Sequence, residues 1–493
     1  MLTEAQNNGH LCMVQEELRS SAHSMLNDGF DKEVVTMDEV TRSIRSMALD
    51  ELLKGDNGFA YLSYNYDNEN FAAGRISSML RHKEKTVDVE KMIADFEEEN
   101  FSLAEKQKEA IEQFFGNRFS IITGGPGTGK STVLKAILEV QQRINPKTDI
   151  FLLAPTGKAA RRMAEATGHE AFTIHSGLHI GEDSGIENIG NILSDVVIVD
   201  EVSMCDMRLF AMLMAAIEPK KTKLLVGDSD QLPSVGAGNV LNELINCGKV
   251  PVTRLNLVYR QGAGSIIPVN SEKINSGDAK LLYNQEFQFL PANDPEVCFK
   301  TVIDRYIKEV NRVGIENACI LCPMKSRGLN CVKEYNERIQ AMMNPPAPNK
   351  AEIQLKNSVF RVGDRIMQTK NSNDVCNGET GFIVEIKKDE DDIQICGIRF
   401  DGRTDVLWYY PEELQYITLS YAITIHKSQG SEFKSVIIPL LKSYYIMLKR
   451  NLLYTAVTRA KSKVILVGER QAVYMAVNKT ETDKRLTQLG KRI

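Results

Sequence analysis

The residues Gly124-Gly125-Pro126-Gly127-Thr128-Gly129-Lys130-Ser131 form a complete G-x-x-x-x-G-K-[ST] loop. The apolar run at 119–123 before it predicts a buried strand, and the run at 132–138 after it predicts a helix whose N-terminus faces the loop. Glycines in this context let backbone N–H groups cradle phosphates, while Lys130 reaches the β- and γ-phosphates and the Ser131 hydroxyl ligates Mg²⁺. The loop therefore predicts a nucleotide site that uses ATP and Mg²⁺.

Two carboxylates predict that the nucleotide is hydrolysed. Asp200 and Glu201 directly follow the β-branched run at 196–199, so they are expected at the edge where a buried parallel strand ends. Asp200 is predicted to hold the metal. Glu201 lies on the other side of the strand end and is the candidate base for the attacking water.

Composition is that of a globular protein of several domains. The chain has 493 residues, of which 43% are hydrophobic and 25% charged, and its formal net charge is −5. No apolar run approaches the roughly 18 residues of a membrane span, and the N-terminus lacks the pattern of a signal peptide. We expect a cytoplasmic protein with no membrane partner. The net charge excludes a globally basic nucleic-acid binder but leaves room for a local basic channel.

The nine cysteines do not predict a disulfide framework, because their number is odd and they are scattered. Cys319 and Cys322 have a C-x-x-C spacing inside an apolar run, where strand alternation places them on opposite faces. Core packing is favoured over a zinc site.

The chain divides into four expected parts. Residues 1–100 read as a mainly helical accessory domain, and 101–255 alternate strand and helix patterns typical of a parallel α/β domain. A second α/β domain is expected over 256–349 and 416–493. Residues 350–415 carry short alternating runs that predict an inserted small antiparallel barrel. Trp408 in that barrel is either part of its core or a base-stacking platform.

Two further motifs add candidate catalytic groups. Gln231 follows another strand directly and is placed beside the phosphate site, where its amide could sense a γ-phosphate. Arg459 lies far downstream in the second α/β domain and is a candidate arginine finger that stabilises charge on the transferring phosphoryl group.

The order of these motifs resembles that of superfamily 1 helicases of the RecD type, the family of the exodeoxyribonuclease V alpha subunit and its free-standing relatives. The resemblance covers about residues 100–470. It implies two RecA-like parallel-sheet motor domains, an inserted Src-homology-3-like barrel and ATP bound in the cleft between the motors. The free-standing relatives usually carry a longer N-terminal region with helix-hairpin-helix elements. By this resemblance residues 1–100 form a helical, winged-helix-like domain, and the sequence resembles a shortened member that begins at the winged-helix-like segment near Gly9-His10.

The resemblance also assigns residues to functions. Gln107 is placed on the adenine and Arg260 on the γ-phosphate. The full nucleotide-binding set is Gln107, Gly125, Gly127, Thr128, Gly129, Lys130, Ser131, Thr132, Gly430 and Glu432. The catalytic set is Lys130, Asp200, Glu201, Gln231, Arg260 and Arg459. The set expected on the single strand is Pro155, Thr156, Lys158, Thr173, His175, Thr424 and Lys427.

The resulting hypothesis is an ATP-dependent motor that moves 5′ to 3′ on single-stranded DNA and opens duplexes with a 5′ tail, in repair or recombination. We expect a monomer that meets recombination or repair proteins as partners. Two alternatives stay open at this point. One is an RNA helicase of the same superfamily, because a 2′-hydroxyl reader cannot be recognised in one sequence. The other is an ATPase clamp or subunit that binds partners without unwinding.

Overall fold

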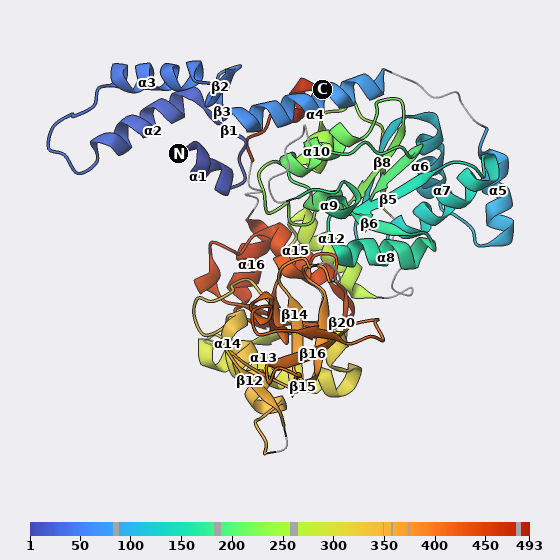
Figure 1. Ribbon diagram of the computed structural model, residues 1–493, viewed down its shortest axis with the longest axis vertical. Coiled ribbons are helices and arrows are strands. Elements are labelled where there is room, and N and C mark those ends of the chain that lie inside the picture. Colours follow the sequence, from blue (N-terminus) through green and yellow to red (C-terminus); the bar gives the residue numbers. More distant parts are fainter. Residues whose placement is uncertain are drawn as a thin grey trace.

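The computed structural model describes residues 1–81, 88–181, 189–256, 265–348, 350–355, 358–372, 375–479 and 485–493. Two parallel sheets dominate it, with a small antiparallel sheet beside the second and a mixed N-terminal unit beside the first (Figure 1). This is the fold class predicted from the sequence, and it is confirmed. None of the described helices combines the length and the apolar character needed to cross a membrane.

The first parallel sheet has six strands in the order β6-β5-β7-β8-β4-β9. Its strands are nearly all apolar because helices cover both faces. The strands are β4 (Phe119–Gly124), β5 (Ile150–Ala154), β6 (Ala171–Thr173), β7 (Val196–Val199), β8 (Thr222–Gly227) and β9 (Val252–Leu255). The helices are α5 (Glu90–Glu99), α6 (Glu105–Gly116), α7 (Lys130–Ile144), α8 (Gly157–Thr167), α9 (Ile174–Gly177), α10 (Met207–Ala216) and α11 (Val240–Asn246).

The second parallel sheet has five strands in the order β10-β21-β20-β11-β19. The strands are β10 (Phe287–Pro291), β11 (Ala318–Cys322), β19 (Ala422–Thr424), β20 (Phe433–Leu440) and β21 (Ala460–Gly468). The accompanying helices are α12 (Ile266–Ser276), α13 (Pro295–Val313), α14 (Val332–Met343), α15 (Arg450–Thr458) and α16 (Arg470–Asn478). Because β10, β11, β20 and β21 run parallel, each pair needs a long crossover, which the helices supply.

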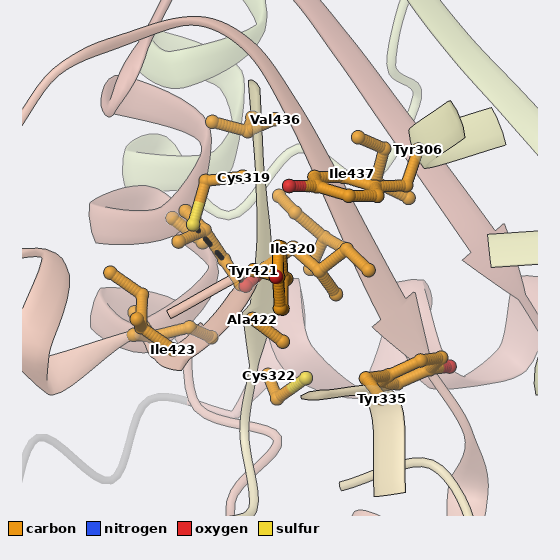
Figure 2. Close-up of a cluster of buried hydrophobic side chains, with 14 of the residues drawn as sticks. Tyr306, Cys319, Ile320, Cys322, Tyr335, Tyr421, Ala422, Ile423, Val436 and Ile437 are labelled. Atoms are coloured by element: carbon orange, nitrogen blue, oxygen red, sulfur yellow. Dashed lines mark hydrogen bonds between the residues drawn. The ribbon is translucent and has the colours of Figure 1, made fainter. Parts of the chain in front are cut away.

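The core of this domain surrounds the central strand β11. Cys319 and Cys322 are both buried on it and lie on opposite sides of the strand, as alternation requires (Figure 2). The Cys319 thiol donates to the Ile320 carbonyl at 3.6 Å. Both cysteines therefore pack as small core side chains.

The antiparallel sheet has the order β17-β16-β15-β14-β18. Its strands are β14 (Arg365–Gln368), β15 (Thr380–Lys388), β16 (Gln394–Phe400), β17 (Leu407–Tyr409) and β18 (Ile417–Leu419), and β12 (Glu352–Gln354) pairs with β13 (Val359–Arg361) beside it. The buried guanidinium of Arg365 donates two hydrogen bonds of 2.6 Å to the carboxylate of Asp401. The sheet shares one hydrophobic cluster with the second parallel-sheet domain, so the two form one packed unit. Trp408 lies on β17 with the Lys387 ammonium 4.0 Å from its ring centre.

The N-terminal unit combines helices with a three-stranded antiparallel sheet of order β1-β3-β2. Its elements are α1 (Leu2–Asn7), β1 (Cys12–Val14), α2 (Gln15–Asn27), α3 (Met37–Leu49), β2 (Leu53–Asp56), β3 (Phe59–Leu62) and α4 (Ser63–Leu80). Helix α4 packs on α10 of the first parallel-sheet domain, and α2 and α3 project away from the rest (Figure 1). The last helix, α17 (Leu489–Arg492), returns to pack against α4 and α11.

Ile320 on β11 provides a test of the core. Its side chain is 0% exposed, so Ile320→Ala should cost about 2–5 kcal/mol of unfolding free energy through lost burial and the cavity left behind. Urea denaturation followed by fluorescence of Trp408, the chain's only tryptophan, reports on this unit. The matched control is Ile446→Ala, where the side chain is 57% exposed and the change should stay within about 0.5 kcal/mol. Equal effects at both positions would contradict the assignment of β11 to the core.

Candidate nucleotide site and nucleic-acid groove

A cleft of about 620 Å³ lies between the two parallel-sheet domains. The first domain contributes the loop between β4 and α7 and the ends of β7 and β8, and the second contributes the start of β20 and the end of α15. Carboxyl ends of parallel strands are the usual ligand edge of such sheets. The cleft is lined by these residues of the predicted sets: Gly127, Gly129, Lys130, Ser131, Thr132, Asp200, Glu201, Gln231, Gly430, Glu432 and Arg459.

The phosphate loop has the conformation that an anion cradle needs. Gly127 and Gly129 have φ values of +78° and +88°, in the left-handed region that favours glycine. A Cβ at Gly129 would lie 2.2 Å from the Gln107 amide nitrogen, so a larger residue would displace that side chain as well as strain the backbone. Lys130 Nζ donates to the carbonyl oxygens of Gly124 and Gly125 at 2.6 and 3.2 Å. The ammonium thus rests on neutral acceptors at a helix N-terminus, a combination suited to phosphate.

Three residues of the predicted nucleotide set do not line the cleft. Thr128 is buried and its hydroxyl donates to the Gly125 carbonyl at 2.8 Å, which shapes the loop from inside. Gln107 is also buried, and its Oε1 accepts from Ala104 N–H at 3.0 Å at the start of α6. Gly125 lies where a Cβ would come within 2.9 Å of the Tyr454 hydroxyl. In this conformation Thr128 and Gln107 make contacts within the loop and at the start of α6, and none of the three residues faces the cleft.

The acidic pair at the end of β7 fits a divalent cation. Burial first, and then the neighbouring Glu201, raise the pKa of Asp200 to about 6, while Lys130 opposes the shift. Glu201 has a φ of +53°, and its Oε2 is buried without a hydrogen-bond partner among the described residues. A carboxylate that is costly to leave charged, next to an unsatisfied carboxylate oxygen, is stabilised by a cation. Asp200 and the Ser131 hydroxyl are the groups that would hold Mg²⁺.

The second parallel-sheet domain brings positive charge to the same cleft. Arg459 is buried, and its guanidinium donates to the carbonyl oxygens of Thr455 and Ser431 at 3.2 and 3.3 Å. Burial lowers its pKa, and the carboxylate of Glu201 is the largest opposing influence. The guanidinium is therefore held in place by neutral acceptors while it faces the acidic side of the cleft.

An ion pair that the sequence did not predict joins the two domains across the cleft. Arg162 of α8 lies 2.5 Å from Glu432, and Lys461 pairs with the same carboxylate at 3.2 Å. Arg162 also donates to the Gly430 carbonyl at 3.2 Å. The only sequence signal for Arg162 is the basic cluster at 158–162, which on its own is more often a solvated face.

A second contact across the domain boundary centres on Asp228, which is buried. Its Oδ2 accepts from the Tyr454 hydroxyl and from Gln231 Nε2, both at 3.1 Å, and its Oδ1 accepts from Asp230 N–H at 3.0 Å. Burial raises the pKa of Asp228, and Lys130 opposes this. The carboxyl group thus connects helix α15 of the second domain with Gln231 at the nucleotide cleft.

A larger groove of about 1320 Å³ runs between the first parallel-sheet domain and the antiparallel sheet. Thr173 and His175 are the residues of the predicted strand-binding set that line it. The Thr173 hydroxyl caps α9 by accepting from Ser176 N–H at 3.0 Å. Removal of the His175 imidazole from water lowers its pKa, which favours the neutral, hydrogen-bonding form of the ring.

Four basic side chains in the groove were not predicted from the sequence. They are Arg161, Arg208, Lys370 and Arg403. Arg161 also joins the groove's two walls, because its guanidinium donates to the carbonyl oxygens of Asp401 and Gly402 at 2.7 and 2.8 Å. These positions lie in four separate segments of the chain, so only the folded structure brings them together.

The other predicted strand contacts lie around the groove rather than in its lining. Thr156 caps α8 by accepting from Ala159 N–H at 3.3 Å, and it follows Pro155. Thr424 accepts from Lys427 N–H at 3.3 Å, and Lys427 Nζ reaches Asn377 in the groove wall at 2.7 Å.

Lys158 and Arg260 stand apart from this arrangement. The Lys158 ammonium lies 5.7 Å from the centre of the Phe433 ring, and burial lowers its pKa to about 8. A contact between Lys158 and a nucleic acid would need this packing to open. Arg260, placed on the γ-phosphate by resemblance, lies outside the described residues.

Family models match three parts of the chain. Residues 102–294 match an AAA domain, 335–399 an ATP-dependent RecD-like DNA helicase SH3 domain, and 419–467 a UvrD-like helicase C-terminal domain.

Two relatives are similar over most of this chain. An ATP-dependent RecD2 DNA helicase of Deinococcus radiodurans is 34% identical over 394 residues, which is 79% of this chain and 52% of that protein. The chain thus spans about half the length of that relative. A RecBCD enzyme subunit RecD of Mycobacterium tuberculosis is 30% identical over 426 residues, 76% of this chain and 70% of that protein. Among solved structures, Pif1 helicase from Candida albicans aligns with a TM-score of 0.46 and 18% identity over 76% of this chain and 96% of that chain.

The contact between Tyr454 and Asp228 can be tested by removing the hydroxyl oxygen of Tyr454. Tyr454→Phe deprives a buried carboxyl group of a donor, and a hydrogen bond to a charged group is worth about 1.5–3 kcal/mol. We expect nucleotide turnover to fall about tenfold or more, measured as steady-state phosphate release. Tyr444→Phe is the control, because that buried hydroxyl bonds the Asn330 carbonyl at 2.6 Å in the same domain. Wild-type turnover in Tyr454→Phe, or equal losses in both variants, would contradict a specific role for this contact.

Proposed function

Because this chain belongs to the RecD-like family of superfamily 1 helicases, we propose that it is an ATP-dependent motor that moves 5′ to 3′ on single-stranded DNA. In this proposal it is a cytoplasmic monomer that separates duplexes carrying a 5′ tail during repair or recombination. The observation that carries the proposal is the nucleotide cleft, which Lys130 and Glu201 enter from one motor domain and Arg459 from the other.

The hydrolysis step follows from the groups around the cleft. Lys130 and the loop N–H groups bind the β- and γ-phosphates, and Ser131 and Asp200 hold Mg²⁺, which supplies neutralisation of phosphate charge when bound. Glu201 orients the attacking water and accepts its proton. Arg459 stabilises the charge that develops on the transferring phosphoryl group, and Gln231 senses the γ-phosphate.

Coupling to movement rests on the same cleft. Phosphates at the boundary attract groups from both domains, so binding favours a closed arrangement and release of product favours an open one. The contacts from Arg162 to Glu432 and from Tyr454 to Asp228 cross this boundary. Two surfaces that grip one strand and move relative to each other then advance along it.

The groove beside the antiparallel sheet is the proposed path of the strand. Its Thr, His, Arg and Lys side chains suit phosphate oxygens rather than base edges. Such binding tolerates any sequence and weakens as salt rises. The 5′ to 3′ polarity and the preference for DNA rest on family membership.

The deciding experiment is ATPase activity with and without single-stranded DNA or RNA, followed by unwinding of 5′-tailed and 3′-tailed duplexes with the same preparation. We expect stimulation by DNA and opening of the 5′-tailed duplex alone. Lys130→Ala should abolish turnover, whereas Lys135→Ala, which alters an exposed pair with Glu139 on the same helix, should not. Stronger stimulation by RNA would replace the DNA assignment, and stimulation without unwinding would favour a translocase or clamp.

Strand binding in the groove is tested by the double variant Thr173→Ala, His175→Ala. Both side chains line the groove and neither lines the nucleotide cleft. We therefore expect a weaker affinity for labelled single-stranded DNA, measured by fluorescence anisotropy at fixed salt, with basal ATPase activity retained. Loss of basal activity would instead assign these residues to the fold.

A further inference from the structure

The C-terminal segment 485–493 lies between the N-terminal unit and the first motor domain, outside the three ranges matched by family models. Leu11 N–H donates to the Leu486 carbonyl at 2.8 Å, and the Thr487 hydroxyl donates to buried Glu69 at 2.6 Å. Gly490 N–H donates to Glu243 of α11 at 3.2 Å. The segment is therefore fixed on both sides.

Its first described residue, Arg485, inserts its guanidinium into the loop that follows β8. One terminal nitrogen donates to the carbonyl oxygens of Gly236 and Gly238 at 2.7 and 2.8 Å and to Ser234 Oγ at 3.2 Å, and the other donates to the Ser234 carbonyl at 2.7 Å. The planar guanidinium holds several donors in one fixed fork. The loop at 233–238 is thus folded around a single side chain from the far end of the sequence.

This loop connects the two candidate sites. On the nucleotide side, Leu232 N–H donates to Thr455 of the second motor domain at 3.0 Å, and Gln429 donates to the Leu232 carbonyl at 3.0 Å. The preceding residue, Gln231, lines the nucleotide cleft.

On the groove side, Met207 N–H donates to the Ala237 carbonyl at 2.9 Å. Gly236 lies against Asp206, since a Cβ there would come within 2.1 Å of the carboxylate. Asp206 caps α10 through Leu209 N–H at 2.8 Å and lines the groove. A displacement of Asp206 in the groove wall would therefore act directly on Gly236 in the loop.

We propose that Arg485 is a positioning residue that couples occupancy of the nucleic-acid groove to the nucleotide cleft. By holding loop 233–238 in one shape, it makes the loop a stiff connection between Asp206 and Gln231. Without the guanidinium the loop gains conformational freedom, and a shift at one end is absorbed before it reaches the other. The inference rests on the proposed function, because it needs a strand in the groove.

The test is Arg485→Ala, with ATPase activity measured over a range of single-stranded DNA concentrations. The hydrogen bonds from Arg485 to Ser234, Gly236 and Gly238 reach residues that line neither the nucleotide cleft nor the groove, so basal kcat and KM for ATP should be unchanged. The increase in turnover caused by DNA should fall about tenfold, the scale of a lost hydrogen bond to a charged group. Arg485→Lys keeps the charge but lacks the fork, so it should behave as Arg485→Ala.

Arg492→Ala is the matched control. It removes the same charge from the same segment, but Arg492 contacts Asp56 and Glu69 of the N-terminal unit at 2.7 and 3.0 Å. It should lower the melting temperature and keep stimulation by DNA. If Arg485→Ala does not fold, Ser234→Ala removes one acceptor and the bond from Ser234 to the Gly236 carbonyl, and should lose part of the stimulation.

The outcomes separate this inference from the function on which it rests. A wild-type protein that DNA does not stimulate overturns both. Normal stimulation in Arg485→Ala overturns only the inference. Rescue by lysine would show that charge alone matters, and equal loss in Arg492→Ala would show general docking of the segment, so either result also overturns it.

Discussion

The burial of Asp228 at the boundary between the two parallel-sheet domains constrains how those domains meet. A carboxyl group taken out of water needs donors, and here they come from Gln231 in its own domain and Tyr454 in the other. Thr455, next to Tyr454, accepts from Leu232 N–H. These hydrogen bonds fix the position of helix α15 at the edge of the first sheet. The same helix ends at Arg459, which lines the cleft. The polar requirement of one buried group thus contributes to the placement of a proposed catalytic arginine more than 200 positions away.

Local sequence patterns predicted the parts of the structure in which the environment of each residue depends on its neighbours in the chain. The run at 196–199 is apolar throughout because β7 is covered on both faces, and the carboxylates after it emerge at the sheet edge. The glycine positions of the phosphate loop are likewise local, since Gly127 and Gly129 have left-handed backbone angles that favour glycine. Such features can be read from ten or twenty consecutive residues.

What the sequence did not predict depends on contacts between distant segments. Arg162 meets Glu432 only after two domains pack, and the groove's basic residues come from four segments. Strand β18 (Ile417–Leu419) belongs to the antiparallel sheet although the insertion was expected to end at 415, because its pairing with β14 is not visible in its own short pattern. Lys158 is the opposite case. Its motif predicted a contact with the single strand, whereas in the structure its ammonium packs against the ring of Phe433 in the neighbouring domain.

The interleaving of the two ends of the chain has a consequence for synthesis. Leu486 N–H donates to His10, 476 positions earlier, and Glu69 receives its Thr487 and Arg492 contacts from the same late segment. At a typical rate of translation these partners emerge roughly 25–95 s apart. During that interval Glu69 has no partner from the tail, and the face of α4 that later receives α17 is uncovered. The N-terminal unit therefore reaches its final packing only after segment 485–493 has been synthesised, although its own residues emerge much earlier.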